Sequence, residues 1–384
     1  MPYRDFRVEY PPGALPAFLL PAYDLGLDRL TDGAHLGPRR DVSKRRYAGS
    51  FVVLMAGLAM LIIAATSFSL AALRASLGHS LLACGVLAAS PLVLGTLLYE
   101  HFDLWPAAVS AIAVAALLRD RTRLAAVILG LAVSVKIYPA LLLPPLIAFA
   151  WKRVGRREAL VALSLACASA LVVTLPFAVV TPGGTAWSVR AQFQRGVQIE
   201  SVASSAVVGL SHLVLKAHEL GVSMPRPSFR LGLSTTPGIS AVEIDGRAVD
   251  VASGLTTALA VALLLVLWVQ FSRSRASKED LVRCSAATLA TAILLGRVLS
   301  PQYLVWLLPL VQLVGGRRGL EATALLEAAL AVTHWWWHEP YRIFSANPTS
   351  GTTLILVSRN ALLAALLLVL VWPRRTREPT PPRI

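Results

Sequence analysis

The sequence predicts an all-α fold: a polytopic bundle of transmembrane helices with about 11 spans and one re-entrant element. Composition is the first reason. Of the 384 residues, 56% are hydrophobic and only 15% are charged, whereas a soluble domain carries about a quarter charged residues. The second reason is that apolar runs long enough to cross a bilayer recur along the whole chain, at 51–73, 160–180, 251–271 and 352–372.

The positive charge of the chain is distributed like that of a membrane protein. A net charge of +15 could indicate a nucleic-acid-binding protein, but Lys and Arg concentrate in short loops between apolar runs, which excludes that class. Alternate loops hold most of this charge, as cytoplasmic loops do. We therefore predict a multi-pass protein of a bacterial plasma membrane, with a cytoplasmic C-terminus and six cytoplasmic loops or tails: 29–47, 119–123, 152–157, 273–283, 317–318 and 374–383.

The order of the spans follows from this charge pattern. Residues 12–28 are expected to run inward and 50–73 to return outward, whereas 81–98, interrupted by Pro91, are expected to be re-entrant or tilted. The later spans then alternate in direction, at 104–118, 124–136, 138–151, 159–180, 251–271, 281–298, 303–315, 319–333 and 350–372.

The chain is expected to form one transmembrane domain, 1–384, without internal repeats. A long outer segment, 181–250, should contain an interfacial helix at 204–220 and an irregular stretch at 225–250, which is rich in turn formers. Residues 1–12 are polar and resemble no signal peptide, yet the topology places them outside. We therefore expect a first helix to be missing upstream of Met1.

Carboxylates near the outer surface are the candidate catalytic groups. Asp5 and Glu9 lie just before the first apolar run, where a carboxylate could act as general base on a sugar hydroxyl. The alternative is that both pair with neighbouring arginines in a solvated loop. Asp103 belongs to a second acidic corner, where it could bind a sugar or act as the N-cap of the helix that follows.

Three cations are embedded between apolar residues: Lys136, Arg297 and Arg359. An isolated cation there costs several kcal/mol unless it is paired or hydrated. Together they could bind a phosphate or pyrophosphate. The alternative is that each side chain extends to the lipid headgroups.

Polar residues at two further places suit a substrate site. Gln302 and Tyr303 lie at a proline-containing joint between two short apolar segments, and polar groups at membrane depth usually line a cavity. Arg195 and Glu200 belong to a polar run of the outer segment that suits a sugar or a headgroup. The aromatic run 333–341 fits an interfacial belt better than a sugar platform, and it offers no third ligand for a metal.

Several of these segments, in this order and spacing, resemble glycosyltransferase family 87 across nearly the whole chain. They are the strip PYRDFRVEYPPGALPAFLLPA, the joint 130–139, the run 195–201, the joint LSPQYLVWLLP and the pair Arg359 and Asn360. The family consists of bacterial membrane glycosyltransferases of the C-type fold, among them polyprenyl-phosphate-mannose-dependent mannosyltransferases of actinobacterial envelopes. Its usual catalytic aspartate lies upstream of the YPP element, in the first outer loop, which here contains Asp5.

The resemblance implies a hexosyltransferase that moves a sugar, mannose above all, from a polyprenyl-phosphate donor to a lipid or glycan acceptor on the extracytoplasmic face. No metal or other cofactor is required. Two other classes stay open: a transporter or flippase for lipid-linked sugars, which would use similar broken helices, and a non-catalytic subunit of an envelope complex.

Overall fold

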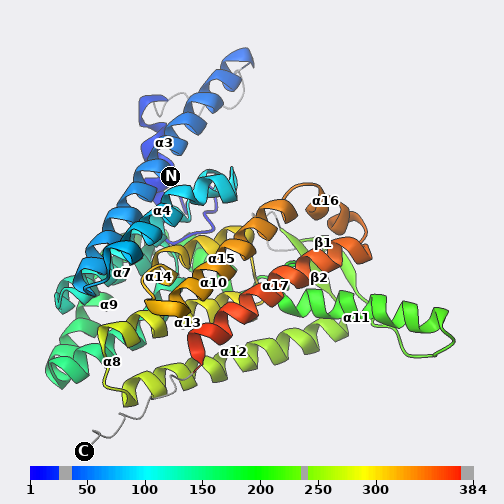
Figure 1. The fold of residues 1–384 in the computed structure, drawn as a ribbon. Coiled ribbons are helices and arrows are strands. Elements are labelled where there is room, and N and C mark those ends of the chain that lie inside the picture. The colour runs from blue at the N-terminus through cyan, green and yellow to red at the C-terminus, as the bar shows by residue number, and fades with distance from the viewer. Residues whose placement is uncertain (26–36, 235–240, 373–384) are drawn as a thin grey trace, which may run out of the picture.

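A computed structural model of the chain describes residues 1–25, 37–234 and 241–372, without the side chains of 24, 25 and 37–43. Nearly all regular structure in these ranges is helical (Figure 1). The helices are η1 (Pro12–Ala14), α1 (Leu15–Leu19), η2 (Leu20–Leu25), α3 (Gly37–Ala72), α4 (Leu77–Leu94), α5 (Leu97–Glu100), α6 (Leu104–Leu118), α7 (Thr122–Val135), η3 (Tyr138–Leu142), α8 (Leu143–Arg153), α9 (Arg156–Val180), α10 (Pro182–Phe193), α11 (Val202–Glu219), α12 (Arg247–Arg273), α13 (Lys278–Leu295), η4 (Pro301–Trp306), α14 (Leu308–Val311), α15 (Gly316–Trp336), α16 (Glu339–Ala346) and α17 (Ser350–Val371).

Hydroxyl side chains define where several of these helices begin. Ser76, Ser201 and Ser277 each accept a hydrogen bond from a backbone N–H in the first turn of α4, α11 and α13. Thr349 and Thr352 form a reciprocal capping box at the start of α17. These bonds satisfy N–H groups that have no partner within the helix.

Five helices among the described residues are long and apolar enough to cross a membrane. They are α4, α9, α12, α17 and the part of α3 from Lys44 to Ala72. The shorter apolar helices, α6 among them, pack inside the bundle, and most of α6 is buried. The chain is therefore a helical membrane protein, as its composition predicts.

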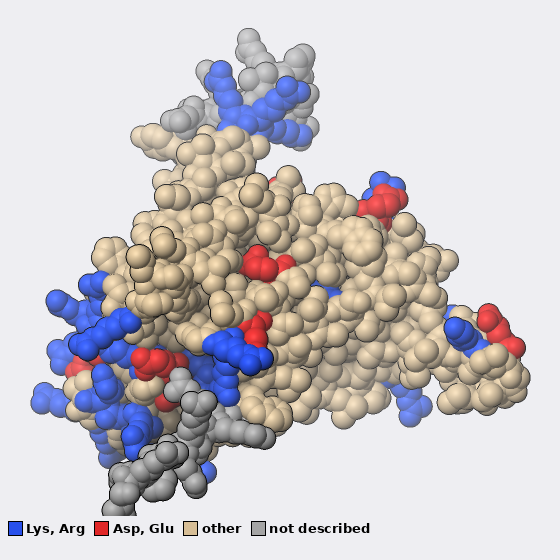
Figure 2. All heavy atoms as spheres, in the orientation of Figure 1, with Lys and Arg blue, Asp and Glu red and all other residues tan. Residues whose placement is uncertain are grey.

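The bundle has two chemically different ends. At one end, which we call the basic end, Asp120 forms ion pairs with Lys278 at 2.7 Å and with Arg153 at 3.8 Å. These ion pairs connect three basic loops. Basic side chains gather at this end of the molecule, at the lower left of Figure 2. Helix α6 runs from Asp103 to the basic end at Arg119. The end that contains Asp103 is called the site end below.

Helix α3 runs in the opposite direction to that expected from the charge pattern. At its start, the Tyr47 hydroxyl donates to the Phe18 carbonyl at 3.2 Å, and the Phe18 ring contacts Phe102 beside Asp103. Near its other end, the Arg119 guanidinium lies 4.9 Å from the Phe68 ring. The start of α3 is therefore at the site end, and the prediction that 29–47 share one side with 119–123 was wrong for the described part. Residues 29–36 and 374–383 lie outside the described ranges.

The reason for this reversal is the structure of the preceding segment. Residues 12–25 form η1, α1 and η2, which are too short to cross a bilayer at 1.5 Å per residue. The described part of the span expected at 12–28 therefore does not run inward across the membrane, and 26–28 lie outside the described ranges. Helix α4, in contrast, continues through Pro91, three residues before its end. Its first turn lies at the basic end, because the His79 ring is 2.9 Å from the carbonyl of Gln312, just before α15.

The segment between α9 and α12 covers the site end. It contains α10, α11 and an antiparallel hairpin of β1 (Arg230–Leu233) and β2 (Val242–Asp245). The hairpin corrects the expectation of an irregular stretch at 225–250, whereas the helix expected at 204–220 is present as α11. Strand β2 also pairs with the loop before α11, through a bridge between Gln198 and Glu243.

Candidate functional site

A cage of aromatic rings forms around Lys136 at the site end. The Lys136 ammonium donates to Asp103 Oδ1 at 2.7 Å, and the Trp306 indole donates to the same oxygen at 2.7 Å. Four rings lie 4.9 to 5.3 Å from the ammonium, in cation–π range: Tyr10, Phe102, Tyr303 and Trp306. The ion pair therefore joins the start of α6 to the end of α7.

The joint after α13 supplies two of the four rings of this cage, Tyr303 and Trp306. The backbone is extended at Gly296 and at Ser300, and the short helix η4 starts at Pro301. The Trp306 ring stacks on Tyr138 with centroids 3.9 Å apart, and on Tyr303 at 4.1 Å. The two prolines of the joint, Pro301 and Pro309, lie in the first turns of η4 and α14. Most of the polar residues at this joint are buried in protein rather than exposed to lipid.

The N-terminal strip folds against this joint and brings Glu9 to it. Glu9 Oε1 lies 3.4 Å from Arg195 Nη1, without forming a hydrogen bond. Arg195 also donates to the Tyr303 hydroxyl at 3.3 Å, and the Gln192 amide donates to the Glu9 carbonyl at 2.8 Å. Two distant segments, the end of α10 and the joint at Tyr303, therefore hold Glu9 in place through its carbonyl and its carboxylate.

Asp5 lies apart from Glu9, although both belong to the same strip. Its side chain is 48% exposed and pairs with Arg4 at 2.8 Å and with the amino terminus. The hydrogen bond from Arg4, together with that from the amino terminus, lowers the pKa of Asp5 to about 2. A carboxylate of such low basicity is a poor proton acceptor near neutral pH.

A buried network fixes the loop that carries Glu200. Arg359, fully buried in α17, donates to the backbone carbonyl of Glu200 and to Asn360 Oδ1. The Asn360 amide in turn donates to Ser205 Oγ at 2.9 Å. On the other side, Glu243 of β2 accepts from the Gly196 N–H at 3.1 Å. Helix α17 and the hairpin therefore clamp 196–205 between them.

These parts enclose a cavity of about 270 Å³ at the site end. Among the described residues, Glu9, Arg195, Glu200 and Gln302 line it, as do the backbone of β2 and one wall of rings, His101, Trp337 and Tyr341. Burial raises the pKa of Glu200 to about 7, against the opposing effect of Arg359. The cavity therefore combines a cation, two carboxylates, amides and aromatic faces, the groups that bind sugars and phosphates.

The structure brings together some of the residues predicted from the sequence and separates others. Glu9, Arg195, Glu200 and Gln302 line the cavity, and Tyr303 binds Arg195. Lys136, Asp103 and Arg359 are buried and do not line the cavity; their hydrogen bonds are made with other protein atoms. The exposed Arg297 contributes its carbonyl, which accepts from the Gln198 N–H at 3.0 Å. Asp103 precedes α6 but makes no capping hydrogen bond.

Sequence reasoning missed the aromatic wall and the hairpin. The rings of Trp337 and Tyr341 lie 5.0 Å apart, and that of His101 lies 6.2 Å from Trp337. The run 333–341 fitted an interfacial belt, and its aromatic density was the signal that could have identified the wall. Nothing in the short stretch 242–245 indicates its pairing with the loop before α11.

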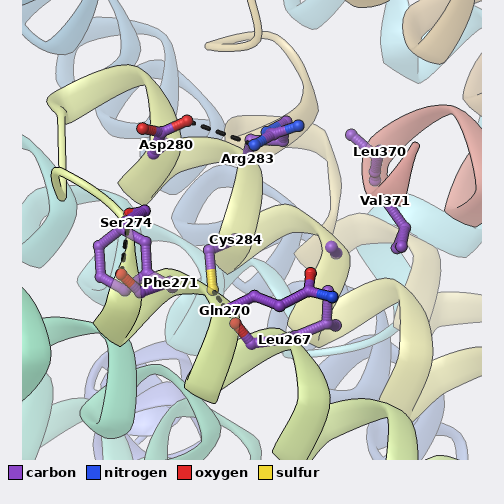
Figure 3. Close-up of a pocket in the computed structure, with 10 residues that line it drawn as sticks. Leu267, Gln270, Phe271, Ser274, Asp280, Arg283, Cys284, Leu370 and Val371 are labelled. Atoms are coloured by element: carbon purple, nitrogen blue, oxygen red, sulfur yellow. Dashed lines mark hydrogen bonds and ion pairs between the residues drawn. The ribbon is translucent and has the colours of Figure 1, made fainter. Parts of the chain in front are cut away.

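A smaller cavity, about 80 Å³, lies at the basic end between α12, α13 and α17 (Figure 3). Three of its polar side chains are already paired: Arg283 donates to Asp280 at 3.3 Å, and Ser274 donates to the Phe271 carbonyl at 2.8 Å. None of the predicted site residues lines it. The cavity at the site end is therefore the better candidate for an active site.

Comparisons with known proteins place the chain in a family. A family model, glycosyltransferase family 87, matches residues 9–301, a range that starts at Glu9 and ends in the joint at Pro301. A comparison with curated proteins found no match. Because the match covers more than half of the chain, this membrane protein belongs to glycosyltransferase family 87.

Proposed function

We propose that the chain is a hexosyltransferase that uses a polyprenyl-phosphate hexose, mannose above all, and that its cavity at the site end is the active site. The observation that carries this proposal is the convergence of Glu9, Arg195 and Glu200 on one cavity of about 270 Å³. The site end would face the extracytoplasmic side and the basic end the cytoplasm of a bacterial cell. The acceptor would be a lipid or a glycan hydroxyl.

Glu9 is the proposed general base. Glu9 lines the cavity with 17% of its side chain exposed, and its buried Oε1 makes no hydrogen bond, so the carboxylate keeps lone pairs that a substrate hydroxyl in the cavity could meet. The acceptor oxygen would attack C1 of the hexose, the bond from C1 to the phosphate oxygen would break, and the hydroxyl proton would pass to Glu9. The products are the glycosylated acceptor, with inverted configuration at C1, and polyprenyl phosphate.

Arg195 is the proposed partner of the leaving phosphate. It lines the cavity, and one tenth of its side chain is exposed. Negative charge grows on the phosphate as the C1–O bond breaks, and a fixed guanidinium stabilises that charge. Lys136 and Arg359 form their hydrogen bonds with protein groups instead, so we assign them a structural role in the site. Glu200, Gln302 and the aromatic wall would bind the hexose through hydrogen bonds and ring faces.

Transfer by the purified protein tests this proposal. The assay supplies radiolabelled polyprenyl-phosphate mannose, or the glucose analogue, with a membrane lipid extract as acceptor. Glu9→Gln should lower the rate of transfer by about 10²- to 10⁴-fold, the usual contribution of a general base, and leave donor binding nearly intact. Glu100→Gln is the matched control, because Glu100 is an exposed carboxylate at the end of α5 that does not line the cavity.

Two results would contradict the proposal. One is a rate of transfer by Glu9→Gln equal to that of the wild type, which would exclude the Glu9 carboxylate as the general base. The other is movement of labelled donor across vesicles without hexose transfer, which would indicate a transporter of lipid-linked sugars.

A further inference from the structure

A groove on the outside of the bundle shares no lining residue with the cavity of the proposed active site. It has a volume of about 850 Å³ and lies between α8, α9 and α12. Its α8 wall is a stripe at helical spacing, Leu143, Ile147 and Trp151, whereas Leu142, Leu146 and Phe149 of the same segment are buried in the core. Leu163 and Leu265 form the facing walls. The groove is therefore an apolar channel open to the side of the protein.

The length of the groove corresponds to one leaflet of a bilayer. Its α8 wall extends from Leu143 to Lys152, which at 1.5 Å per residue is about 14 Å. The hydrocarbon core of a bilayer is about 30 Å thick. An acyl chain from one leaflet would therefore fit along the groove.

The mouth of the groove is at the basic end and carries an excess of positive charge. Lys152 and Ser272 line it there. Lys152 is exposed and forms no ion pair within the described ranges, and the same is true of arginines at the adjoining helix ends, Arg156, Arg157, Arg273 and Arg275. These helix ends belong to the basic surface at the lower left of Figure 2.

The acidic side chains nearby are mostly occupied. Glu158 pairs with Arg123 at 2.9 Å, Asp280 with Arg283 at 3.3 Å, and Asp120 with two other cations. Glu279 alone among the carboxylates at these helix ends has no ion pair in the described part of the chain. An anion from outside the protein is therefore the complementary partner for Lys152.

Two tryptophans mark the depth at which that anion would lie. Trp151 is 56% exposed next to Lys152, and Trp268 is held across the groove by a hydrogen bond from its N–H to Thr288 at 3.2 Å. Tryptophan concentrates at the level of lipid headgroups. The rings, the lysine and the apolar channel therefore match the headgroup and acyl chain of one lipid.

We propose that this groove binds one anionic phospholipid, with its phosphate at Lys152 and an acyl chain along α8. The site is separate from the active site, so it does not depend on the sugar or the acceptor. A basic side chain near an anionic headgroup contributes about fivefold in affinity, and the channel fixes where that lipid lies.

Native mass spectrometry of the full chain tests the proposal. The protein is released from nanodiscs that contain equal amounts of phosphatidylglycerol and phosphatidylcholine, which share acyl chains and differ in headgroup charge. We expect the wild type to retain one phosphatidylglycerol in preference. Lys152→Gln should reduce that preference about fivefold. Ile147→Trp, or Leu265→Trp if the first variant does not fold, should abolish retention by filling the channel.

Matched controls lie on other surfaces of the protein. Lys216→Gln removes an exposed lysine from α11, and Val172→Trp adds a ring to the exposed face of α9; neither should change lipid retention. Equal retention of both lipids by wild type and Lys152→Gln would overturn the proposal in favour of unselective lipid. Displacement of the lipid by millimolar inorganic phosphate would also overturn it, because the site would then bind a free anion.

Discussion

Lys136 and Asp103 form an ion pair of 2.7 Å in which less than one tenth of either side chain is exposed. The two residues lie 33 positions apart and connect the start of α6 with the end of α7. A charge buried in this way is stable only while its partner remains. The pair is therefore a structural element of the site end.

Removal of one member should destabilise the protein strongly. Asp103→Asn keeps the shape of the side chain but leaves the Lys136 ammonium without a counter-charge, at a cost of about 3–5 kcal/mol. We expect a clear drop in Tm in detergent. Glu321→Gln is the control, since it breaks an exposed ion pair with Arg317 and should leave Tm nearly unchanged. A Tm of Asp103→Asn equal to wild type would show that the cage tolerates an unpaired lysine.

Replacement of Arg195 should affect the donor. Arg195→Gln removes charge-assisted hydrogen bonds of about 1.5–3 kcal/mol, so KM for the polyprenyl-phosphate donor should rise about ten- to a hundredfold. Arg195→Lys should recover part of the loss, because it restores the charge without the planar fork. Arg190→Gln, an exposed arginine in the neighbouring α10, is the control. If Arg195→Gln leaves KM for the donor unchanged, another cation must bind the donor phosphate.

The stability of the protein should depend on pH through Glu200. Burial raises the pKa of this carboxyl in the folded protein from 4.5 to about 7. Between these two values the folded state binds a proton that the unfolded state has released, so the free energy of unfolding falls as pH rises and levels off above 7. Tm measured from pH 4.5 to 8 should show this decline, and Glu200→Gln should flatten it. A slope that Glu200→Gln leaves intact must come from another group.

The two ends of α3 should lie on opposite sides of the membrane. We expect single cysteines at Arg45 and Gly221 to react with an impermeant thiol reagent from the same side, and cysteines at Arg156 and Arg275 from the other side. The three native cysteines, Cys84, Cys167 and Cys284, are first replaced by alanine. If the cysteine at position 45 is labelled from the same side as the cysteine at position 156, the direction of α3 that the charge pattern predicts would be correct.

Hydropathy and family motifs predicted the class of the protein and most helices, because both depend on residues close together in the sequence. The direction of α3 could not be predicted in the same way. It depends on whether 12–25 cross the membrane or fold back, and the contacts of Tyr47 with Phe18 and of Arg119 with Phe68 decide that.

The same limit applies to the candidate site. A cation between apolar residues is a clear signal in the sequence. Of the three cations that it marks, Lys136 and Arg359 are buried in the structure, whereas Arg297 is exposed. Their roles depend on partners that the sequence does not indicate, Asp103 for Lys136 and the carbonyl of Glu200 for Arg359. Carboxylates four residues apart looked equivalent, yet only Glu9 faces the cavity.

The docking of the N-terminal strip has a consequence for biosynthesis. Gln192, which holds the Glu9 carbonyl, is made 183 residues after it, and a Cβ on Gly184 or Gly13 would collide with the backbone of Tyr3 or Ser134. The strip can therefore reach its place only after α10 has left the ribosome. Contacts this distant in sequence form late, so the Glu9 carboxylate joins the cavity only after about half of the 384 residues have been made. With Glu9 as the proposed general base, a growing chain would have no transfer activity before that point.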